Sequence, residues 1–170
     1  MNPYLTHIDY PINIDKIKAL ARQRTQDIVS KDYASIPDQH GFNRITIKNN
    51  WEDESYAQKI YYDFFDEYPT IDNYKPKIYF QAANYQVPFH TDTDANSAVN
   101  FVILDDVDET ELLFEDGPTF KYRSAILNTN IRHSVITHLK KRILFKINSP
   151  EPYEDFVKRC KYVRQDDVHF

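Results

Sequence analysis

Residues 133–147 read HSVITHLKKRILFKI, in which two short segments rich in β-branched and apolar residues flank a polar turn. The segments 133–136 and 142–147 have the composition of β-strands. If they pair as an antiparallel hairpin through the turn at 138–141, Arg142 lies beside the strand that begins at His133. We therefore predict two neighbouring strands, each beginning with a side chain that can bind a ligand.

Similar segments recur along the middle of the chain, separated by turn-forming residues. The predicted strands lie at 77–83, 98–104, 111–114, 124–127, 133–136 and 142–147. Many short strands at near-regular spacing predict a sandwich or barrel and disfavour a parallel α/β sheet.

The parts of the chain that flank these strands have helical patterns. Apolar residues recur at helical spacing in 14–22, and a second helical segment begins at Trp51 and ends before Pro69. We expect the helices to brace one outer face of a mainly β, α+β domain. We predict that residues 1–170 form one domain. Its parts are a helical and mixed support region at 1–76, a strand core at 77–150 and a C-terminal tail or helix at 151–170.

The composition argues against several classes of protein. With only Gly41 and Gly117, the chain cannot form a glycine-rich phosphate loop. The single Cys160 leaves no internal disulfide and no thiolate cluster. A net charge of −5 disfavours general nucleic-acid binding. The chain has no apolar segment of about 18 residues and no signal-peptide pattern, so we expect a cytoplasmic protein without membrane association.

The segment 87–92, VPFHTD, contains the first candidate ligands. On an extended strand, residues i and i+2 point to the same side, so His90 and Asp92 can converge on one ion. Two histidines and one carboxylate suit non-haem iron(II). Of the six histidines, His133 is the natural third ligand because it begins a strand within the strand-rich region.

Arg142 follows His133 by nine residues and opens an apolar strand. A guanidinium at that place can form a bidentate pair with the distal carboxylate of a bound diacid. A solvated basic turn formed with the two preceding lysines is the alternative for this residue.

Together, these residues resemble the His-x-Asp…His…Arg pattern of the iron(II)/2-oxoglutarate-dependent oxygenases, over roughly 77–150. The segments 85–92 and 125–135 are similar to the small prolyl-hydroxylase and aspartyl/asparaginyl-hydroxylase branches. The resemblance implies a double-stranded β-helix, which is a cupin-like jelly roll. It also implies Fe(II) bound by His90, Asp92 and His133, with 2-oxoglutarate bound by Arg142. Dioxygen would be the cosubstrate, ascorbate a reductant, and the reaction hydroxylation of a free or protein-bound amino-acid side chain.

One position departs from this pattern. Many relatives carry Ser or Thr two residues after the arginine, where this chain has Leu144. We therefore expect a second contact to 2-oxoglutarate from Tyr79, Gln81 or Asn100. Halogenating relatives have a small residue in place of the aspartate, so Asp92 disfavours halogenation.

Other classes of protein remain open at this stage. A cupin-like barrel that binds a metal or ligand without catalysis would share the strand pattern, but it has no need of a diacid anchor. A zinc hydrolase would need a nearby general base, and no His-Glu-x-x-His motif occurs. The expected partner is a small-molecule, peptide or protein substrate of unspecified identity.

Overall fold

A computed structural model describes residues 1–30, 42–46, 55–81, 83–93, 95–103, 110–140 and 142–165. The start of the second predicted helix, at 51–54, lies outside these ranges. The elements in chain order are β1 (Leu5–His7), α1 (Ile14–Ser30), β2 (Phe42–Thr46), α2 (Ser55–Phe65), the short 3-10 helix η2 (Asp72–Tyr74), β3 (Lys77–Gln81), β4 (Ser97–Val102), β5 (Thr110–Phe114), β6 (Thr119–Phe120), β7 (Ser124–Leu127), β8 (His133–Thr137), β9 (Arg142–Ser149) and α3 (Tyr153–Arg159).

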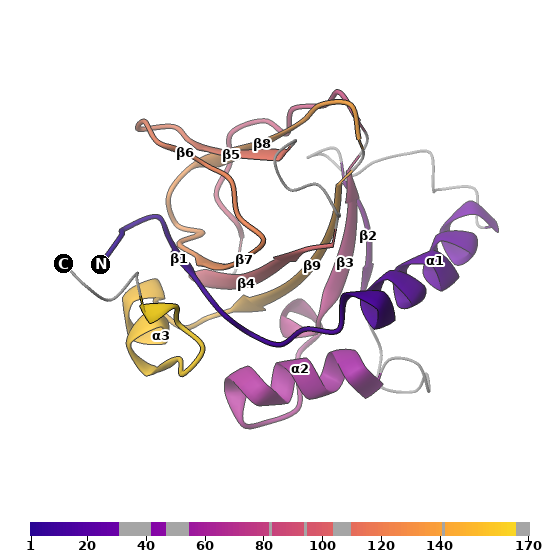
Figure 1. The fold of residues 1–170 in the computed structure, drawn as a ribbon, viewed down its shortest axis with the longest axis horizontal. Helices are drawn as coiled ribbons and strands as arrows, with labels where there is room; N and C mark the ends of the chain where they lie inside the picture. The colour runs from indigo at the N-terminus through magenta and orange to yellow at the C-terminus, as the bar shows by residue number, and fades with distance from the viewer. Residues whose placement is uncertain are drawn as a thin grey trace.

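Two antiparallel sheets face each other (Figure 1). The larger has six strands in the order β1-β7-β4-β9-β3-β2, and the smaller has the order β6-β5-β8. The segment 86–90 runs beside β8, to which it is joined by isolated bridges between Gln86 and Ile136 and between His90 and His133. This double-stranded β-helix with flanking helices confirms the predicted fold class.

The central strand β9 separates the two halves of the core. Because alternate side chains point to opposite faces of a strand, Arg142, Leu144 and Lys146 share one face, and Phe145 and Ile147 share the other. Phe145 and Ile147 are fully buried in the core that includes the helices. The face of β9 that carries Arg142, Leu144 and Lys146 is directed toward the smaller sheet.

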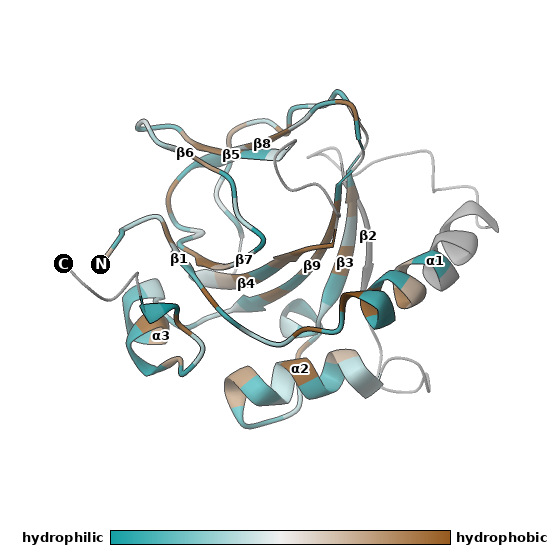
Figure 2. Cartoon of the chain, in the orientation of Figure 1, coloured by the Kyte–Doolittle hydropathy of each residue, from teal (hydrophilic) through white to brown (hydrophobic). Residues whose placement is uncertain are grey.

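The helices cover the outer face of the six-stranded sheet, as the sequence predicted (Figure 1). Ile17 of α1, Phe64 of α2 and Phe156 of α3 are buried together with Phe101 and Phe145 of the sheet. Figure 2 shows apolar positions alternating with polar ones along these helices and apolar segments along β3, β4 and β9. In the described part of the chain, no helix is long and apolar enough to cross a membrane.

A second core fills the space between the two sheets. Leu112, Phe114 and Val135 from the smaller sheet are buried with Tyr79 and Leu144 from the larger one. This apolar interior surrounds the side chains that form the candidate site.

The predicted hairpin between β8 and β9 is wrong. β8 pairs with β5, whereas β9 pairs with β3 and β4, so the chain crosses from the smaller sheet to the larger between them. The physical reason is that β9 is buried on both faces, with Leu144 in the core between the sheets and Phe145 and Ile147 in the core under the helices, which favours a central place in the sheet. The residue pattern also did not predict the short strands β1, of three residues, and β6, of two residues.

Candidate metal and diacid site

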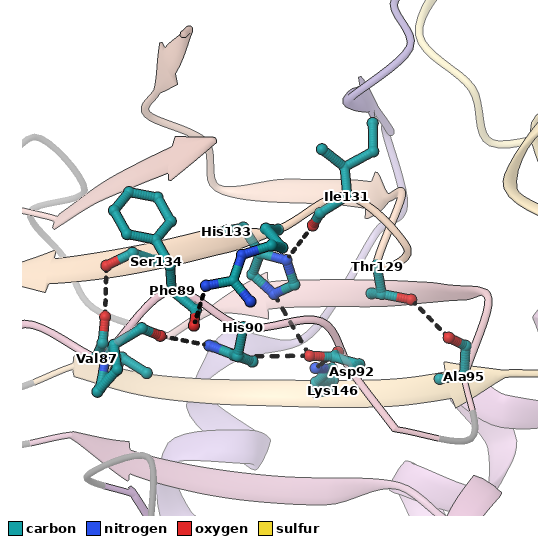
Figure 3. A network of polar contacts seen from close by, with 12 residues as sticks. Val87, Phe89, His90, Asp92, Ala95, Thr129, Ile131, His133, Ser134 and Lys146 are labelled. Carbon is teal, nitrogen blue, oxygen red and sulfur yellow. Dashed lines mark hydrogen bonds and ion pairs between the residues drawn. The ribbon is translucent and has the colours of Figure 1, made fainter. Parts of the chain in front are cut away.

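The three predicted metal ligands lie together (Figure 3), and two of them, His90 and His133, line an inner cavity. The ligand atoms of His90, Asp92 and His133 all lie within 4.8 Å of one another. Asp92 Oδ1 is 3.5 Å from His90 Nε2 and 3.4 Å from His133 Nε2. Each of the three side chains is at most 14% exposed.

Backbone hydrogen bonds between distant segments bring these side chains together. His90 N–H donates to His133 O at 3.0 Å, and His133 N–H donates to His90 O at 2.9 Å. Asp92 N–H donates to Thr129 O at 3.2 Å. Pro88 has no N–H group, so the segment before His90 can pair with β8 only in part and forms an edge of the smaller sheet.

Two backbone carbonyls orient the imidazoles. His90 Nδ1 lies 2.7 Å from Pro88 O, and His133 Nδ1 lies 2.8 Å from Ile131 O. Because a carbonyl oxygen only accepts hydrogen bonds, each Nδ1 carries a proton, which leaves Nε2 to supply the lone pair of a metal ligand when the imidazole is neutral. Two such lone pairs converge with a carboxylate oxygen, which is the arrangement by which proteins orient histidine ligands toward a metal. The donor set therefore fits a divalent first-row metal.

Lys146 supplies a positive charge beside the carboxylate. Its Nζ forms an ion pair with Asp92 Oδ2, and its side chain is 12% exposed. Burial raises the pKa of the Asp92 carboxyl, but the charge of Lys146, together with the two neighbouring histidines, outweighs this and holds that pKa well below its ordinary value. Burial lowers the pKa of Lys146, and the Asp92 charge outweighs this so that the pKa is raised. Both groups are therefore charged at neutral pH.

A polar cluster lies deeper in the same cavity. The Arg142 side chain is 2% exposed. Arg142 Nη2 donates to Tyr122 Oη at 2.8 Å, and Asn100 Nδ2 donates to the same oxygen at 3.0 Å. Arg142 Nε and Asn100 Oδ1 have no hydrogen-bond partner among the described residues. A buried guanidinium with an unused donor fits the carboxylate of a bound ligand.

The residues predicted to make a second diacid contact have different surroundings. Tyr79 and Asn100 line the cavity together with Arg142. Gln81 does not line it, although it is paired with Arg142 in the register of β3 and β9. Its side-chain amide instead donates to the carbonyls of Tyr85 and Val135, each at 3.3 Å.

Two polar residues of the cavity, Lys146 and Tyr122, were not predicted as site residues. Lys146 left a signal in the sequence: it is a charged residue in an apolar strand, on the same face as Arg142. Nothing in the local sequence marks Tyr122 as a site residue. The chain has 13 tyrosines, and only the tertiary fold shows which of them lies beside Arg142.

The charges of the cavity favour an anionic ligand beside the metal. Its described lining includes the cations Arg142 and Lys146 and no carboxylate. The apolar side chains of Leu112, Val135 and Leu144 line the same cavity. The described side chains therefore offer donors for a dication at His90, Asp92 and His133 and a donor for a carboxylate at Arg142.

The sequence matches no protein-family model and no curated protein. The fold is similar to a prolyl-4-hydroxylase from Pseudomonas putida, at 10% identity over 88% of this chain and 94% of that chain, with a TM-score of 0.58. It is also similar to the viral collagen prolyl hydroxylase vCPH from Paramecium Bursaria Chlorella virus-1, solved as its 2OG complex. For vCPH the identity is 12% over 85% of this chain and 94% of that chain, with a TM-score of 0.57.

A third similar structure is AviO1 from Streptomyces viridochromogenes Tue57. The identity is 13% over 88% of this chain and 91% of that chain, with a TM-score of 0.51. At these identities the likeness concerns the fold. The chain therefore has the double-stranded β-helix fold of the prolyl hydroxylases, which is the fold that its His-x-Asp…His…Arg motif implied.

Proposed function

We propose that this protein is an iron(II)- and 2-oxoglutarate-dependent dioxygenase that hydroxylates an amino-acid side chain, either free or protein-bound. The observation that carries the proposal is that one cavity is lined by His90 and His133, which form a metal donor set with Asp92, and also by the buried, incompletely bonded Arg142. The likeness to prolyl hydroxylases supports the choice of substrate class.

In this proposal, His90, Asp92 and His133 hold iron(II) and leave the cavity side of the ion open. The carbonyls that bind the two Nδ1 atoms keep both imidazoles in the required tautomer. The buried Asp92 stays ionised and offers a negative charge to the metal.

Arg142 would bind the far carboxylate of 2-oxoglutarate through its free Nε and a neighbouring N–H group. Tyr122, held by both Arg142 and Asn100, can donate its hydroxyl proton to the same carboxylate. In this proposal, Tyr122 makes the second contact to 2-oxoglutarate, which many relatives make with a Ser or Thr at the position of Leu144. The apolar side chains around the chain of the cosubstrate exclude water.

Bound iron and 2-oxoglutarate would supply the oxidising chemistry, in which 2-oxoglutarate, dioxygen and a substrate C–H group yield succinate, carbon dioxide and the hydroxylated substrate. The protein's part is to bind, orient and desolvate the reactants. No described side chain is needed as a general base.

A cupin-like barrel without catalysis is the alternative function. It would account for the donor set, but a buried, unpaired guanidinium costs folding energy and serves no purpose without an anionic ligand. A zinc hydrolase is less well supported, since the described cavity lining includes no carboxylate to act as general base and Asp92 beside it is assigned to the metal.

The test is succinate formation from 2-oxoglutarate by protein reconstituted anaerobically with iron(II) and then given oxygen and ascorbate. The assay needs no knowledge of the substrate, because such enzymes convert 2-oxoglutarate to succinate slowly even when no substrate is hydroxylated. We expect His90→Ala to abolish both iron binding and succinate formation. His138→Ala is the matched control, because His138 is half exposed and pairs with Glu111. Wild-type protein that binds iron but forms no succinate would favour the non-catalytic barrel.

A further inference from the structure

Lys146 is an unusual residue for its place in the fold, and its position bears on how the proposed metal site works. It lies between Phe145 and Ile147 on the central strand β9, where an apolar side chain would pack without cost. Its ammonium group is largely buried, and burying such a charge costs several kcal/mol unless it is paired. The partner it has is Asp92, a predicted metal ligand.

The two oxygens of Asp92 face different groups. Oδ1 faces the Nε2 atoms of His90 and His133, at 3.5 and 3.4 Å. Oδ2 pairs with Lys146 Nζ on the other side of the carboxylate (Figure 3). One oxygen is thus directed to the metal position, and the other is occupied by the lysine.

From this geometry we infer that Lys146 is a positioning residue that keeps Asp92 a one-oxygen ligand of the metal. The inference rests on the proposed function. A carboxylate can bind a metal through one or both of its oxygens. An octahedral ion with two imidazoles and one carboxylate oxygen keeps about three open positions, and 2-oxoglutarate takes two of them. A second oxygen from Asp92 would leave no position open once the cosubstrate is bound.

The register of the sheet supplies a matched control for this role. Lys77 is the partner of Lys146 across β3 and β9, and it is also buried. Its Nζ donates to the backbone carbonyls of Asp72, Asn73 and Lys75, away from the metal ligands. Replacing Lys77 therefore removes a buried ammonium group without touching Asp92.

The test uses Mn(II) as the probe and water-proton relaxation as the readout, because relaxation counts the exchangeable waters bound to the ion. In the wild type we expect about three such waters, and about one after 2-oxoglutarate binds. In Lys146→Met we expect about two waters, and none with 2-oxoglutarate, together with about tenfold weaker 2-oxoglutarate binding. Lys146→Arg should restore the wild-type values, and Lys77→Met should leave them unchanged. Lys146→Gln serves as a second neutral variant if Lys146→Met does not fold.

The outcomes separate the inference from the proposed function. If the wild type takes up no Mn(II), the metal site and the proposed function fail together. If the wild type binds Mn(II) and Lys146→Met has the same hydration and the same 2-oxoglutarate affinity, only the role of Lys146 is overturned. A loss of thermal stability with unchanged hydration would likewise reduce Lys146 to a structural residue.

Discussion

Replacing Arg142 by methionine should remove ligand binding and stabilise the empty protein at the same time. The Arg142 side chain is 2% exposed, and no ion pair to a carboxylate is found for it in the described part of the chain. Its hydrogen bond at 2.8 Å goes to the neutral hydroxyl of Tyr122. In the protein without a ligand, most of the desolvation free energy of this buried charge is therefore not offset by an ion pair.

The two effects have different magnitudes. A bound carboxylate would gain two charge-assisted hydrogen bonds from the guanidinium, each of about 1.5–2 kcal/mol. Their loss corresponds to roughly 100- to 1,000-fold weaker 2-oxoglutarate binding. Methionine has a similar shape and no charge, and replacing buried charges by apolar side chains stabilises proteins by about 1–4 kcal/mol. A gain of about 2 kcal/mol would raise the melting temperature by roughly 4–8 °C.

Calorimetric titration of the Mn(II)-loaded protein with 2-oxoglutarate measures the first effect, and thermal unfolding of the metal-free protein measures the second. Arg164→Met is the control, since the side chain of Arg164 is 42% exposed and pairs with Asp9, away from the predicted site residues. The reasoning is refuted if Arg142→Met binds 2-oxoglutarate as the wild type does, or if the metal-free variant melts several degrees below the wild type.

Three further predictions concern the metal, pH and the core. Saturating Mn(II) at 100 times its dissociation constant should add about 2.7 kcal/mol to the free energy of unfolding; His133→Ala should show no such gain, and a chelator should reverse it in the wild type. Burial raises the pKa of Asp63, but hydrogen bonds from Tyr10 and Lys59 lower it overall. Because the folded pKa is the lower one, this stabilisation is present above the unfolded value of about 3.9 and is lost as pH falls through the folded pKa. Denaturation curves between pH 6 and pH 2.5 should therefore show a steeper loss of stability in the wild type than in Asp63→Asn. Phe145→Ala, at a fully buried position, should cost about 3–5 kcal/mol in chemical denaturation; Leu139→Ala, at a position 81% exposed, should change stability by less than about 0.5 kcal/mol.

Strand composition and turn residues predicted most of the elements in the middle of the chain. β7 lies at the predicted residues, and β8 and β9 begin at the predicted residues, His133 and Arg142. Pairing was less predictable: β8 and β9 lie in different sheets, because the partner of a strand depends on both of its faces and not on the length of the turn alone. The short strands β1 and β6 depend on pairing with distant residues for their existence, so their own composition does not reveal them.

For the candidate site, the sequence by itself determined the residue types and their local spacing. His90 and Asp92 are two positions apart, which places both side chains on one side of an extended strand, and the metal prediction came from this pair together with His133 and Arg142. What only the tertiary structure decided is which distant groups share the cavity. It brought Tyr122 to Arg142, turned Gln81 to backbone carbonyls and set Lys146 against Asp92. The reason is that these contacts join residues 20 to 54 positions apart, so they follow from the closure of two sheets on each other and not from any local pattern.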